Sequence, residues 1–323
     1  MLTQLPDLAS KEVILCAGSL DDPKILMHSG IGPRAQLDQF NIPVVKDIPS
    51  IGQGLRDHIF CPLVYARRPD TNDRAAFYND PAAMDAALDQ WHRDRTGPLT
   101  RFACQLTIGF FKLNNTVISA AAEFQALPPD QQAHILHPTI PHYEVITHFP
   151  THMFLPPDVA PPDSASIMVF PQNNQSRGQV TLQSADPAVP LLFDPRLLSH
   201  PFDQRVAIEC LREALRIAQT DSFARDTVSV LSGPEGDSDE QLLAYWRRTA
   251  SSSWHMTGTV KMGKAGEEDG AAVDGEFRLM GFEGLRVADM SVVPVLTSGH
   301  TQAVAYVTGM TCAEKLVAEY GLA

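Results

Sequence analysis

Positive charge is scarce in this sequence of 323 residues. It contains 25 lysines and arginines against 38 aspartates and glutamates, which gives a formal net charge of −13 and a pI near 5.2. An acidic surface repels phosphate backbones and anionic lipid headgroups. We therefore expect neither nucleic acid nor a membrane as a partner.

Cysteine is also sparse. The five cysteines are scattered and form no CxxC pair, so the sequence predicts neither a disulfide framework nor a zinc site. Cys16, in the run VILCAG, and Cys312, in a helical run, are interpreted as small buried hydrophobic residues.

Long apolar runs are missing too. No apolar stretch reaches the roughly 18 residues that a membrane-spanning helix needs. The N-terminal stretch does not combine a basic segment with an apolar one, as a signal peptide would. The localisation stays unknown on these grounds, with the cytoplasm as the default expectation.

Apolar residues are nevertheless plentiful enough for sizeable cores. With 44% hydrophobic residues, a chain of this length suggests about two domains. Lys11–Gly18 predicts a buried strand, and PKILMHSGIG predicts a short helix from Pro23 to Gly30. A second small strand is expected at Ile42–Val45. This alternation is typical of the edge of an α/β nucleotide-binding domain.

Between Ile59 and Thr249 the pattern changes. Alternating segments predict antiparallel strands, and amphipathic segments predict helices. The resulting architecture is a mixed antiparallel sheet with helices on one face. We expect strands at Ser166–Phe170 and Gly178–Gln183 and helices at Asp80–Arg93, Pro201–Gln219 and Ser238–Arg248.

After Ser251 the chain returns to short apolar runs and glycines. Leu285–Ala288 predicts a buried strand, and Ala303–Glu319 predicts a long closing helix. The expected domain pattern is therefore discontinuous. Residues 1–58 and 250–323 form an α/β domain, and residues 59–249 form an α+β domain inserted into it.

Two of the eleven histidines stand out by their positions. His255, in SSSWHMTGT, precedes a glycine turn, and His300, in TSGHTQAVAY, lies between a glycine and the start of a helix. Rigid scaffolds often present reactive groups at such junctions, and a helix N-terminus directs partially positive N–H groups at a developing anion. A capping or core role remains the alternative for each histidine.

Five blocks of sequence, in the same order, resemble the glucose-methanol-choline (GMC) oxidoreductases. They are GSLDDPKILMHSGIGP, IPSIGQGLRDH, GQVTLQSADPAVPLLFDPRLLSHPFDQ, WHMTGTVKMG and VDGEFRLMGFEGLRVADMSVVPVLTSGHTQ. They cover nearly the whole chain and are similar to the C-terminal portion of these enzymes. The resemblance implies a partial FAD-binding, Rossmann-like domain at 1–58 and 250–323, and a substrate-binding domain at 59–249.

The resemblance also implies roles for single residues. His255 matches the general base that takes the proton of a substrate alcohol, and His300 matches the residue that holds the alcohol oxygen by a hydrogen bond. FAD then accepts the hydride. For the residues that match FAD contacts, a purely structural role is equally open. These are Asp289 and Met290, at the ribityl and phosphate portion, and Trp254, Thr301 and Gln302, near the isoalloxazine ring.

Other polar groups are given structural interpretations. Asp57–His58 would suit an acid/base pair, but a turn-stabilising role is favoured in this loop. Glu267, Glu268 and Asp269 are expected to form a solvated loop. Five clustered histidines have irregular spacing and no completing carboxylate or cysteine, so no metal site is predicted. They are His134, His137, His142, His148 and His152.

The sequence departs from the family pattern in one respect. The dinucleotide fingerprint GxGxxG, which lets the backbone approach a pyrophosphate, is absent. Most FAD-binding energy is then expected to be missing, and a truncated sheet would expose strand edges and apolar faces. A complementary N-terminal chain or self-association is therefore the expected partner.

Three functions fit these residues. The first is an FAD-dependent alcohol oxidase or dehydrogenase that acts on CH–OH donors. The second is a cofactor-free acid/base catalyst of secondary metabolism, an isomerase, dehydratase or cyclase with the same histidine pair. The third is a non-catalytic subunit. Aromatic residues of the middle domain favour a hydrophobic or aromatic alcohol as substrate: Phe102, Phe110, Phe111, Tyr143, Phe149, Phe154 and Phe170.

Overall fold

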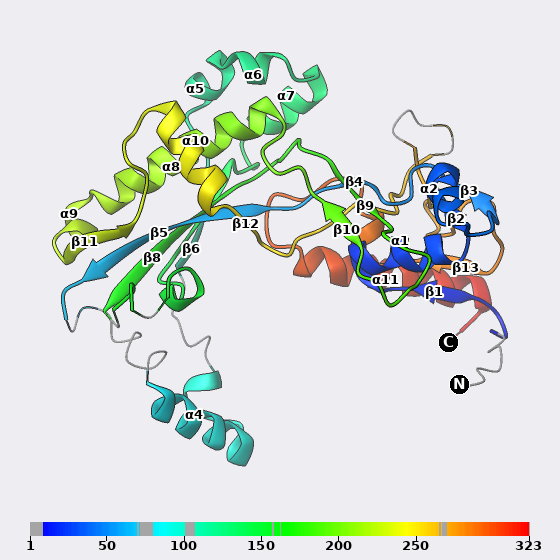
Figure 1. Cartoon of the computed structure of the whole chain (residues 1–323), viewed down its shortest axis with the longest axis horizontal. Helices are drawn as coiled ribbons and strands as arrows, with labels where there is room; N and C mark the ends of the chain where they lie inside the picture. Colours follow the sequence, from blue (N-terminus) through cyan, green and yellow to red (C-terminus); the bar gives the residue numbers. More distant parts are fainter. Residues whose placement is uncertain are drawn as a thin grey trace. The chain divides into compact units, whose positions relative to one another are not determined.

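The chain folds into two compact units, each built from separated segments. Unit 1 contains residues 1–58, 174–200 and 254–323, and unit 2 contains residues 59–173 and 201–253. Figure 1 shows the N-terminal strand, in blue, beside the C-terminal helix, in red, within unit 1. The computed structural model describes residues 9–69, 71, 80–100, 107–156, 158–161, 163–264, 266 and 270–322.

Parallel pairing of the two chain ends organises unit 1. Strand β1 (Val13–Leu15) runs parallel to β13 (Leu285–Val287), with Ile14 opposite Arg286. The Arg286 guanidinium is 1% exposed and donates from Nε to Glu12 at 2.7 Å. It also pairs with Glu319 of α11 (Gln302–Tyr320). This network joins the first strand, the last strand and the last helix.

Two further small sheets complete unit 1. In the first, β9 pairs antiparallel with both β10 and β4, and in the second β2 pairs in parallel with β3. The core lies between these sheets and the helices, around Met27, Ile51 and Val260. The remaining elements of the unit are α1 (Gly18–His28), β2 (Ile31–Gly32), α2 (Arg34–Gln39), β3 (Lys46–Asp47), β4 (Gln53–Leu55), β9 (Gly178–Thr181), β10 (Leu192–Asp194) and the 3-10 turn η3 (Met290–Val292).

Helix α1 begins at Gly18, not at Pro23 as predicted, so proline lies inside it. Proline has no N–H to donate to the carbonyl of Ser19, four residues earlier. Thr259 replaces that donor, because its Oγ1 donates to the Ser19 carbonyl at 2.7 Å. A partner from the other end of the chain therefore lets the helix continue through proline.

Two further expectations for this region are wrong. Ile42–Val45 is not a strand, and β3 starts at Lys46 instead, because Pro43 cannot donate a ladder hydrogen bond. Cys16 is exposed, whereas Cys312 is buried as expected. The reason is that β1 leaves apolar side chains at the surface, with Val13 48% and Ile14 38% exposed.

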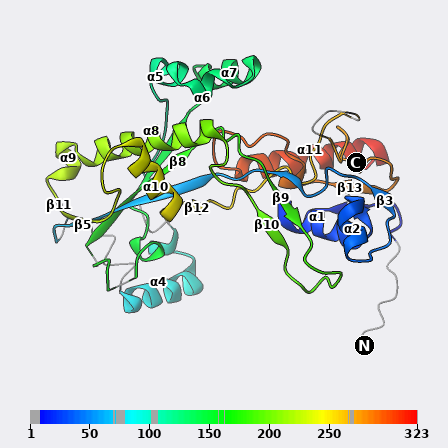
Figure 2. The same ribbon diagram turned by 45° about the horizontal axis from the view of Figure 1, so that its top comes forward.

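Unit 2 is an antiparallel sheet with helices over one face. The strand order is β11-β5-β8-β7-β6, and β12 also pairs with β5. Every residue of the central strands β5 and β8 is buried. Figures 1 and 2 both show α8 and α10 over the same face. The strands are β5 (Ile59–Arg67), β6 (Thr107–Phe111), β7 (Tyr143–Thr147), β8 (Ser164–Pro171), β11 (Thr227–Ser232) and β12 (Ser251–Ser252).

The long helices of unit 2 follow their sequence patterns. Helix α8 buries Val206, Cys210 and Leu211, which lie on one amphipathic face. Helix α10 starts at a Ser238 capping box and anchors Trp246, whose Nε1 donates to Ala207 O at 2.7 Å. The helices are α4 (Pro81–Asp94), α5 (Asn115–Ala120), α6 (Ala122–Gln125), α7 (Pro129–Leu136), α8 (Pro201–Ala218), α9 (Asp221–Ala224) and α10 (Asp239–Thr249), with 3-10 turns η1 (Pro98–Thr100) and η2 (Thr151–Met153).

The predicted fold class, α/β with an α+β insertion, is confirmed. The units differ from the expected 59–249 division in residues 174–200, which pack in unit 1. The cause is the pairing of β9 with β4, in which Gln179 lies opposite Gln53. Within the described part of the chain, no helix is both long enough and apolar enough to cross a bilayer.

Candidate active site

Two segments of unit 1 that carry histidines run side by side. Arg56 N donates to Thr257 O at 3.1 Å, and Thr257 N donates to Arg56 O at 2.9 Å. The Asp57 carboxylate then accepts the backbone N–H of His255 at 2.9 Å. This antiparallel bridge aligns residues 56–58 with residues 255–257, so that His58 faces His255.

Three imidazole rings lie in contact as a result. The Nδ1 atoms of His58 and His255 are 3.0 Å apart, and their ring centroids lie 5.2 Å apart, edge to face. The ring of His255 lies 5.3 Å from that of His300, centroid to centroid. The structure therefore brings together His255 and His300, the pair selected from the sequence, and adds His58 to them.

Burial keeps two of these three rings neutral. His58 is 1% exposed, and burial, reinforced by His255 and His300, lowers its pKa to about 3. Burial and the neighbouring His300 lower the pKa of His255 to about 4. Both rings are consequently uncharged at neutral pH, and a neutral imidazole can accept a proton.

The contact between the two Nδ1 atoms limits the tautomers of the pair. A hydrogen bond between neutral rings needs one protonated and one unprotonated nitrogen. If His58 donates, the proton of His255 lies on Nε2 and that nitrogen cannot act as a base. If His255 donates from Nδ1, its Nε2 carries the lone pair. Only the second arrangement makes His255 a base at Nε2.

Sequence reasoning missed the part played by His58. Asp57 does support the backbone, as a turn-stabilising residue would, since it holds the His255 N–H. His58, however, presents its ring to His255 and does not serve the turn alone. The contact joins residues 197 positions apart, so local pattern does not reveal it. The available signal was the block IPSIGQGLRDH, which ends on this histidine.

Asp289 and Met290, expected at FAD, lie where β1 and β13 end. Asp289 Oδ2 accepts the Gly18 N–H at 2.5 Å, and its Oδ1 accepts the Ser291 N–H at 2.7 Å. The Met290 carbonyl accepts the N–H of Gly258 at 3.2 Å. These contacts place both residues beside the start of α1, whose N-terminal N–H groups suit an anionic group.

A second carboxyl adjoins Asp289. Asp22 is 0% exposed, and burial together with the hydrogen-bonded Asp289 carboxyl raises its pKa to about 7. Ala17 N donates to Asp22 at 2.9 Å, and Ser291 Oγ donates to it at 3.2 Å. Asp22 therefore holds its proton to higher pH than an exposed aspartate does.

Trp254, Thr301 and Gln302 flank the histidines along the chain. Trp254 is 68% exposed and has φ of +59°, a left-handed conformation that strains a bulky residue. Thr301 is 8% exposed and precedes α11, which begins at Gln302. The indole next to His255 is therefore exposed and carried by a left-handed backbone.

The residues present fit the ring end of FAD. Trp254 offers an exposed aromatic face, and the N-terminal N–H groups of α11 adjoin the exposed His300. Asp289 lies beside the N-terminus of α1, where backbone N–H groups gather. The sequence has no GxGxxG turn for the pyrophosphate. The fit therefore extends over part of the cofactor only.

Among the clustered histidines of unit 2, His142 is bonded within its own unit. His142 is 2% exposed, accepts the Leu113 N–H at 3.1 Å and lies 2.9 Å from Ile135 O. Within the described residues, no His, Cys, Asp or Glu group has a metal-binding arrangement. The His152 side chain, Phe102 and Glu267–Asp269 lie outside what the structure describes.

The predicted substrate-pocket aromatics mostly build unit 2 itself. Phe170 is buried with Phe60, and Phe149 and Phe154 pack against that cluster. Phe111 stacks on Tyr143 with centroids 5.4 Å apart. Phe110 is 46% exposed. These rings form a cluster and a stacked pair within the unit.

Two models of one family match this chain. A GMC oxidoreductase N-terminal model matches residues 3–60, and the C-terminal model of the same family matches residues 174–309. The chain belongs to the GMC oxidoreductase family. The first match corrects the expectation of a C-terminal portion only, because residues 3–60 correspond to part of the N-terminal model.

Curated relatives are similar along almost all of the chain. A glucose methanol choline oxidoreductase, atC of Aspergillus terreus, is 32% identical over 96% of this chain and 49% of its own length. Versicolorin B synthase of Aspergillus parasiticus is 31% identical over 96% and 46%. Oxygen-dependent choline dehydrogenase of Klebsiella pneumoniae is 33% identical over 95% and 51%. The chain thus spans about half the length of these relatives.

Solved structures agree with the family. A formate oxidase variant of Aspergillus oryzae superposes with a TM-score of 0.82 at 27% identity, over 97% of this chain and 55% of its own. A fungal aryl-alcohol oxidase gives 0.75 at 28% identity, over 96% and 55%. Membership of the family implies FAD as the cofactor.

Proposed function

We propose that this chain supplies the proton-handling part of an FAD-dependent oxidoreductase that oxidises an alcohol at a CH–OH group. The observation that carries the proposal is the contact of three imidazoles, His58, His255 and His300, within unit 1. When bound, FAD supplies the acceptor for the hydride. The remaining work falls to the residues of this chain.

Proton transfer is the step that His255 performs. The neutral ring accepts the hydroxyl proton at Nε2, while its Nδ1–H donates to His58 Nδ1. His58 thereby selects the basic tautomer and, as a buried acceptor, supports the imidazolium that forms. His300 binds the same alcohol oxygen by a hydrogen bond. Removal of the proton makes the carbon a hydride donor.

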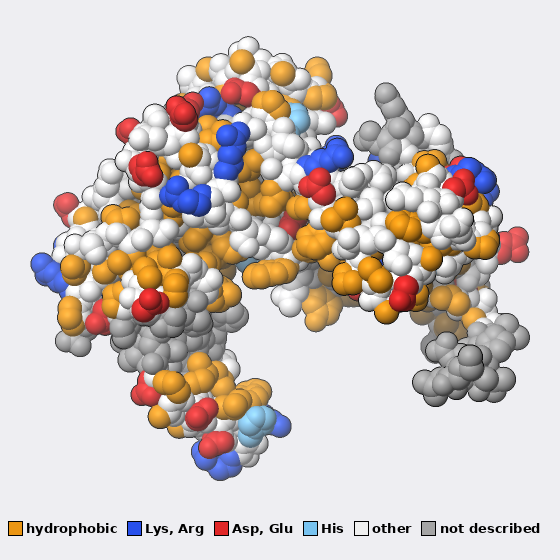
Figure 3. Space-filling view, viewed as in Figure 1, with side chains coloured by type: hydrophobic (Ala, Val, Ile, Leu, Met, Phe, Trp, Pro, Cys, Tyr) orange, Lys and Arg blue, Asp and Glu red, His pale blue; other side chains and the backbone are white. Residues whose placement is uncertain are grey.

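A complementary polypeptide is part of the proposal. Hydrophobic side chains reach the surface of unit 1 (orange in Figure 3). Val13 and Ile14 of β1 and Met310 of α11 are exposed hydrophobic residues of this unit. Parallel strands are normally covered on both faces. A second chain with the remaining half of the family's architecture would cover them and complete the FAD site. Self-association of this chain is the alternative.

A hydrophobic or aromatic alcohol is the proposed substrate class. The support is the similarity to a protein described as an aryl-alcohol oxidase.

Anaerobic reduction of flavin absorbance tests the proposal. The full chain is mixed with FAD and a polypeptide that corresponds to the N-terminal half of the Aspergillus terreus relative, and benzyl alcohol is added. We expect bleaching that slows by about 100-fold or more in His255→Asn, since a general base typically contributes that much. His137→Asn, at an exposed histidine of unit 2, is the matched control. Equal rates in both variants would refute the role of His255.

A cofactor-free reaction is the second candidate. Its support is the 31% identity to a relative named as a synthase, not as an oxidase or dehydrogenase. The same imidazoles would then transfer protons within a substrate without net oxidation. Turnover by the flavin-free chain to a product of unchanged mass, abolished in His255→Asn, would favour this candidate over the first.

A further inference from the structure

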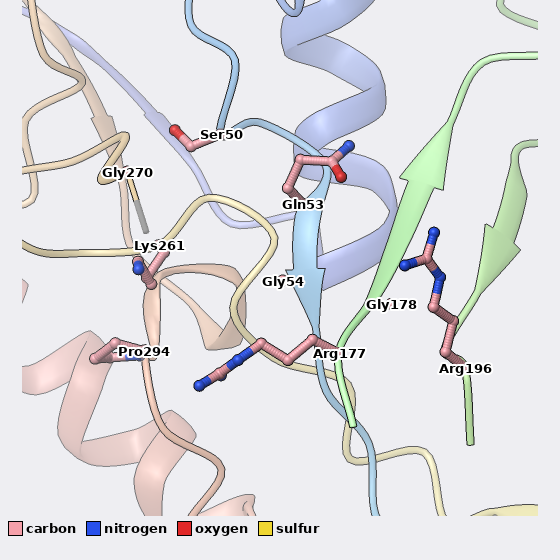
Figure 4. A pocket seen from close by; sticks show the side chains of 9 residues that line it. All are labelled: Ser50, Gln53, Gly54, Arg177, Gly178, Arg196, Lys261, Gly270 and Pro294. Atoms are coloured by element: carbon pink, nitrogen blue, oxygen red, sulfur yellow. The ribbon is translucent and has the colours of Figure 1, made fainter. Parts of the chain in front are cut away.

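Unit 1 contains a hollow of about 230 Å³ that none of the three histidines lines. Its walls combine three cationic side chains, Arg177, Arg196 and Lys261, with the backbone of three glycines, Gly54, Gly178 and Gly270 (Figure 4). No carboxylate is among the described residues that line it. The described lining of this hollow is therefore cationic and polar, in a chain of net charge −13.

The three cations are not equivalent. Figure 4 shows Arg177 extending across the base of β4 toward the side where Lys261 lies, and both are half-buried. Arg196 stands beyond Gly178, is 52% exposed and pairs with Asp194 at 3.7 Å. Arg177 and Lys261 therefore form the inner pair of the hollow.

Two of the glycines that line the hollow cannot be replaced by residues with a side chain. Gly54 has φ of +80°, which disfavours any side chain there. At Gly178 a Cβ would lie 2.0 Å from the Asp194 carbonyl, so this position also has room for glycine only. Polar backbone and the inner cations are what the hollow presents to an occupant.

We propose that this hollow binds a small oxyanion, the phosphate or carboxylate group of a metabolite, between Arg177 and Lys261. A guanidinium offers a planar fork that matches two oxygens of such a group, and an ammonium adds a compact charge. At about 30 Å³ per water, the space equals roughly eight waters. That suits a phosphate or carboxylate with a short carbon skeleton.

The same chain segments carry the histidines. Gly54 precedes His58 by four residues, Lys261 follows His255 by six, and Pro294, which also lines the hollow, precedes His300 by six. The hollow is thus lined by residues from all three segments that carry the imidazole cluster. The site is additional to the proposed alcohol oxidation, which assigns it no role.

Isothermal titration calorimetry on the full chain tests the inference without FAD. Inorganic phosphate, glycerol 3-phosphate and succinate are titrated at constant ionic strength, with sodium chloride as the blank. We expect saturable binding of at least one oxyanion, weakened about tenfold or more in Arg177→Gln and in Lys261→Gln. Arg196→Gln should weaken it less than threefold. The phosphate and succinate arms distinguish phosphate from carboxylate recognition.

Several outcomes would overturn the site. One is heat indistinguishable from the chloride blank in a chain whose circular dichroism is native. A second is an equal loss in Arg225→Gln, a charge removal at an exposed arginine of unit 2. A third is binding that arises only after Glu267, Glu268 and Asp269 are neutralised. That result would mean that the cations pair with carboxylates of their own chain and not with an external anion.

Discussion

The Nδ1 atom of His58 lies 3.0 Å from the Nδ1 atom of His255. A hydrogen bond between these two nitrogens contains a single proton. The ring that carries this proton determines which nitrogen of His255 is basic. The second ring nitrogen of a basic histidine is often hydrogen-bonded to a carboxylate or a backbone carbonyl, which orients the ring. Here a second imidazole, itself buried and neutral, takes that part.

The first prediction concerns this orienting contact. His58→Phe keeps a buried ring but removes the acceptor, so His255 should lose its preference for the Nδ1–H tautomer. His58→Asn places an amide oxygen near the former Nδ1 and should restore part of it. We expect alcohol-dependent flavin reduction in the complemented enzyme to fall about 10- to 100-fold in the first variant and less in the second.

Nitrogen NMR of the histidine side chains reports the tautomer directly. The His255 signal would not change if His58 had a structural role only. The His255 Nδ1 signal should be that of a protonated nitrogen in the native chain and in His58→Asn, and shift toward an unprotonated one in His58→Phe. An unchanged His255 signal in a folded His58→Phe chain would show that His58 does not set the tautomer.

The second prediction follows from the carboxyl pair of Asp22 and Asp289. The pKa of Asp22 is raised to about 7 in the folded chain, whereas the unfolded residue ionises near 4. As the pH rises from about 4 to about 7, the unfolded state loses its proton first. The free energy of unfolding should therefore fall over this window, by about 4 kcal/mol, and level off above it.

Asp22→Asn tests this dependence because an amide stays neutral and keeps the acceptor for Ala17 N–H. Urea unfolding between pH 4 and pH 8 should show the decline in the native chain and lose it in the variant. Asp21→Asn, at the exposed neighbouring position, should retain the native slope. A native chain without the decline would mean that Asp22 is ionised throughout.

The third prediction concerns acid sensitivity. The pKa of His58 is lowered to about 3, so the folded chain resists protonation there while the unfolded chain accepts a proton near pH 6.5. This contribution to stability is present above pH 6.5 and is lost as the pH falls toward 3. His58→Asn should thus lose less stability than the native chain between pH 6.5 and pH 4, by a few kcal/mol. Thermal unfolding of both, with His134→Asn as the exposed control, gives the difference.

The fourth prediction tests the network at the joined chain ends. Arg286→Ala would leave Glu12 buried without its cation and should cost about 3–5 kcal/mol of unfolding free energy. Arg278 pairs with the same Glu319 but is 44% exposed, so Arg278→Ala should cost less than about 1 kcal/mol. Urea titration of both variants measures the contrast, and equal costs would contradict a buried network.

Much of the secondary structure could be predicted because its determinants are local. The amphipathic face of α8, the Ser238 cap of α10 and the apolar run of β13 are each contained in a short stretch of sequence. The motif resemblance located His255 and His300 for the same reason.

The failures share a non-local cause. Helix α1 passes through Pro23 only because Thr259, 240 positions from Ser19, bonds to its carbonyl. Segment 174–200 has the same kind of sequence pattern as the rest of the middle region, and only the pairing of β9 with β4 assigns it to unit 1. His58 looked like a loop residue because its partner, His255, lies far along the sequence.

The parallel pairing of β1 with β13 carries a consequence for synthesis. Val13 of β1 pairs with Leu285 of β13, so β1 has no neighbouring strand until β13 is synthesised. Pairing of residues so far apart in the sequence is slow, because it closes a long loop. Unit 2 needs nothing beyond residue 253 and can fold before residues 254–323 are synthesised. During that interval β1 lacks β13, the strand with which it pairs in unit 1.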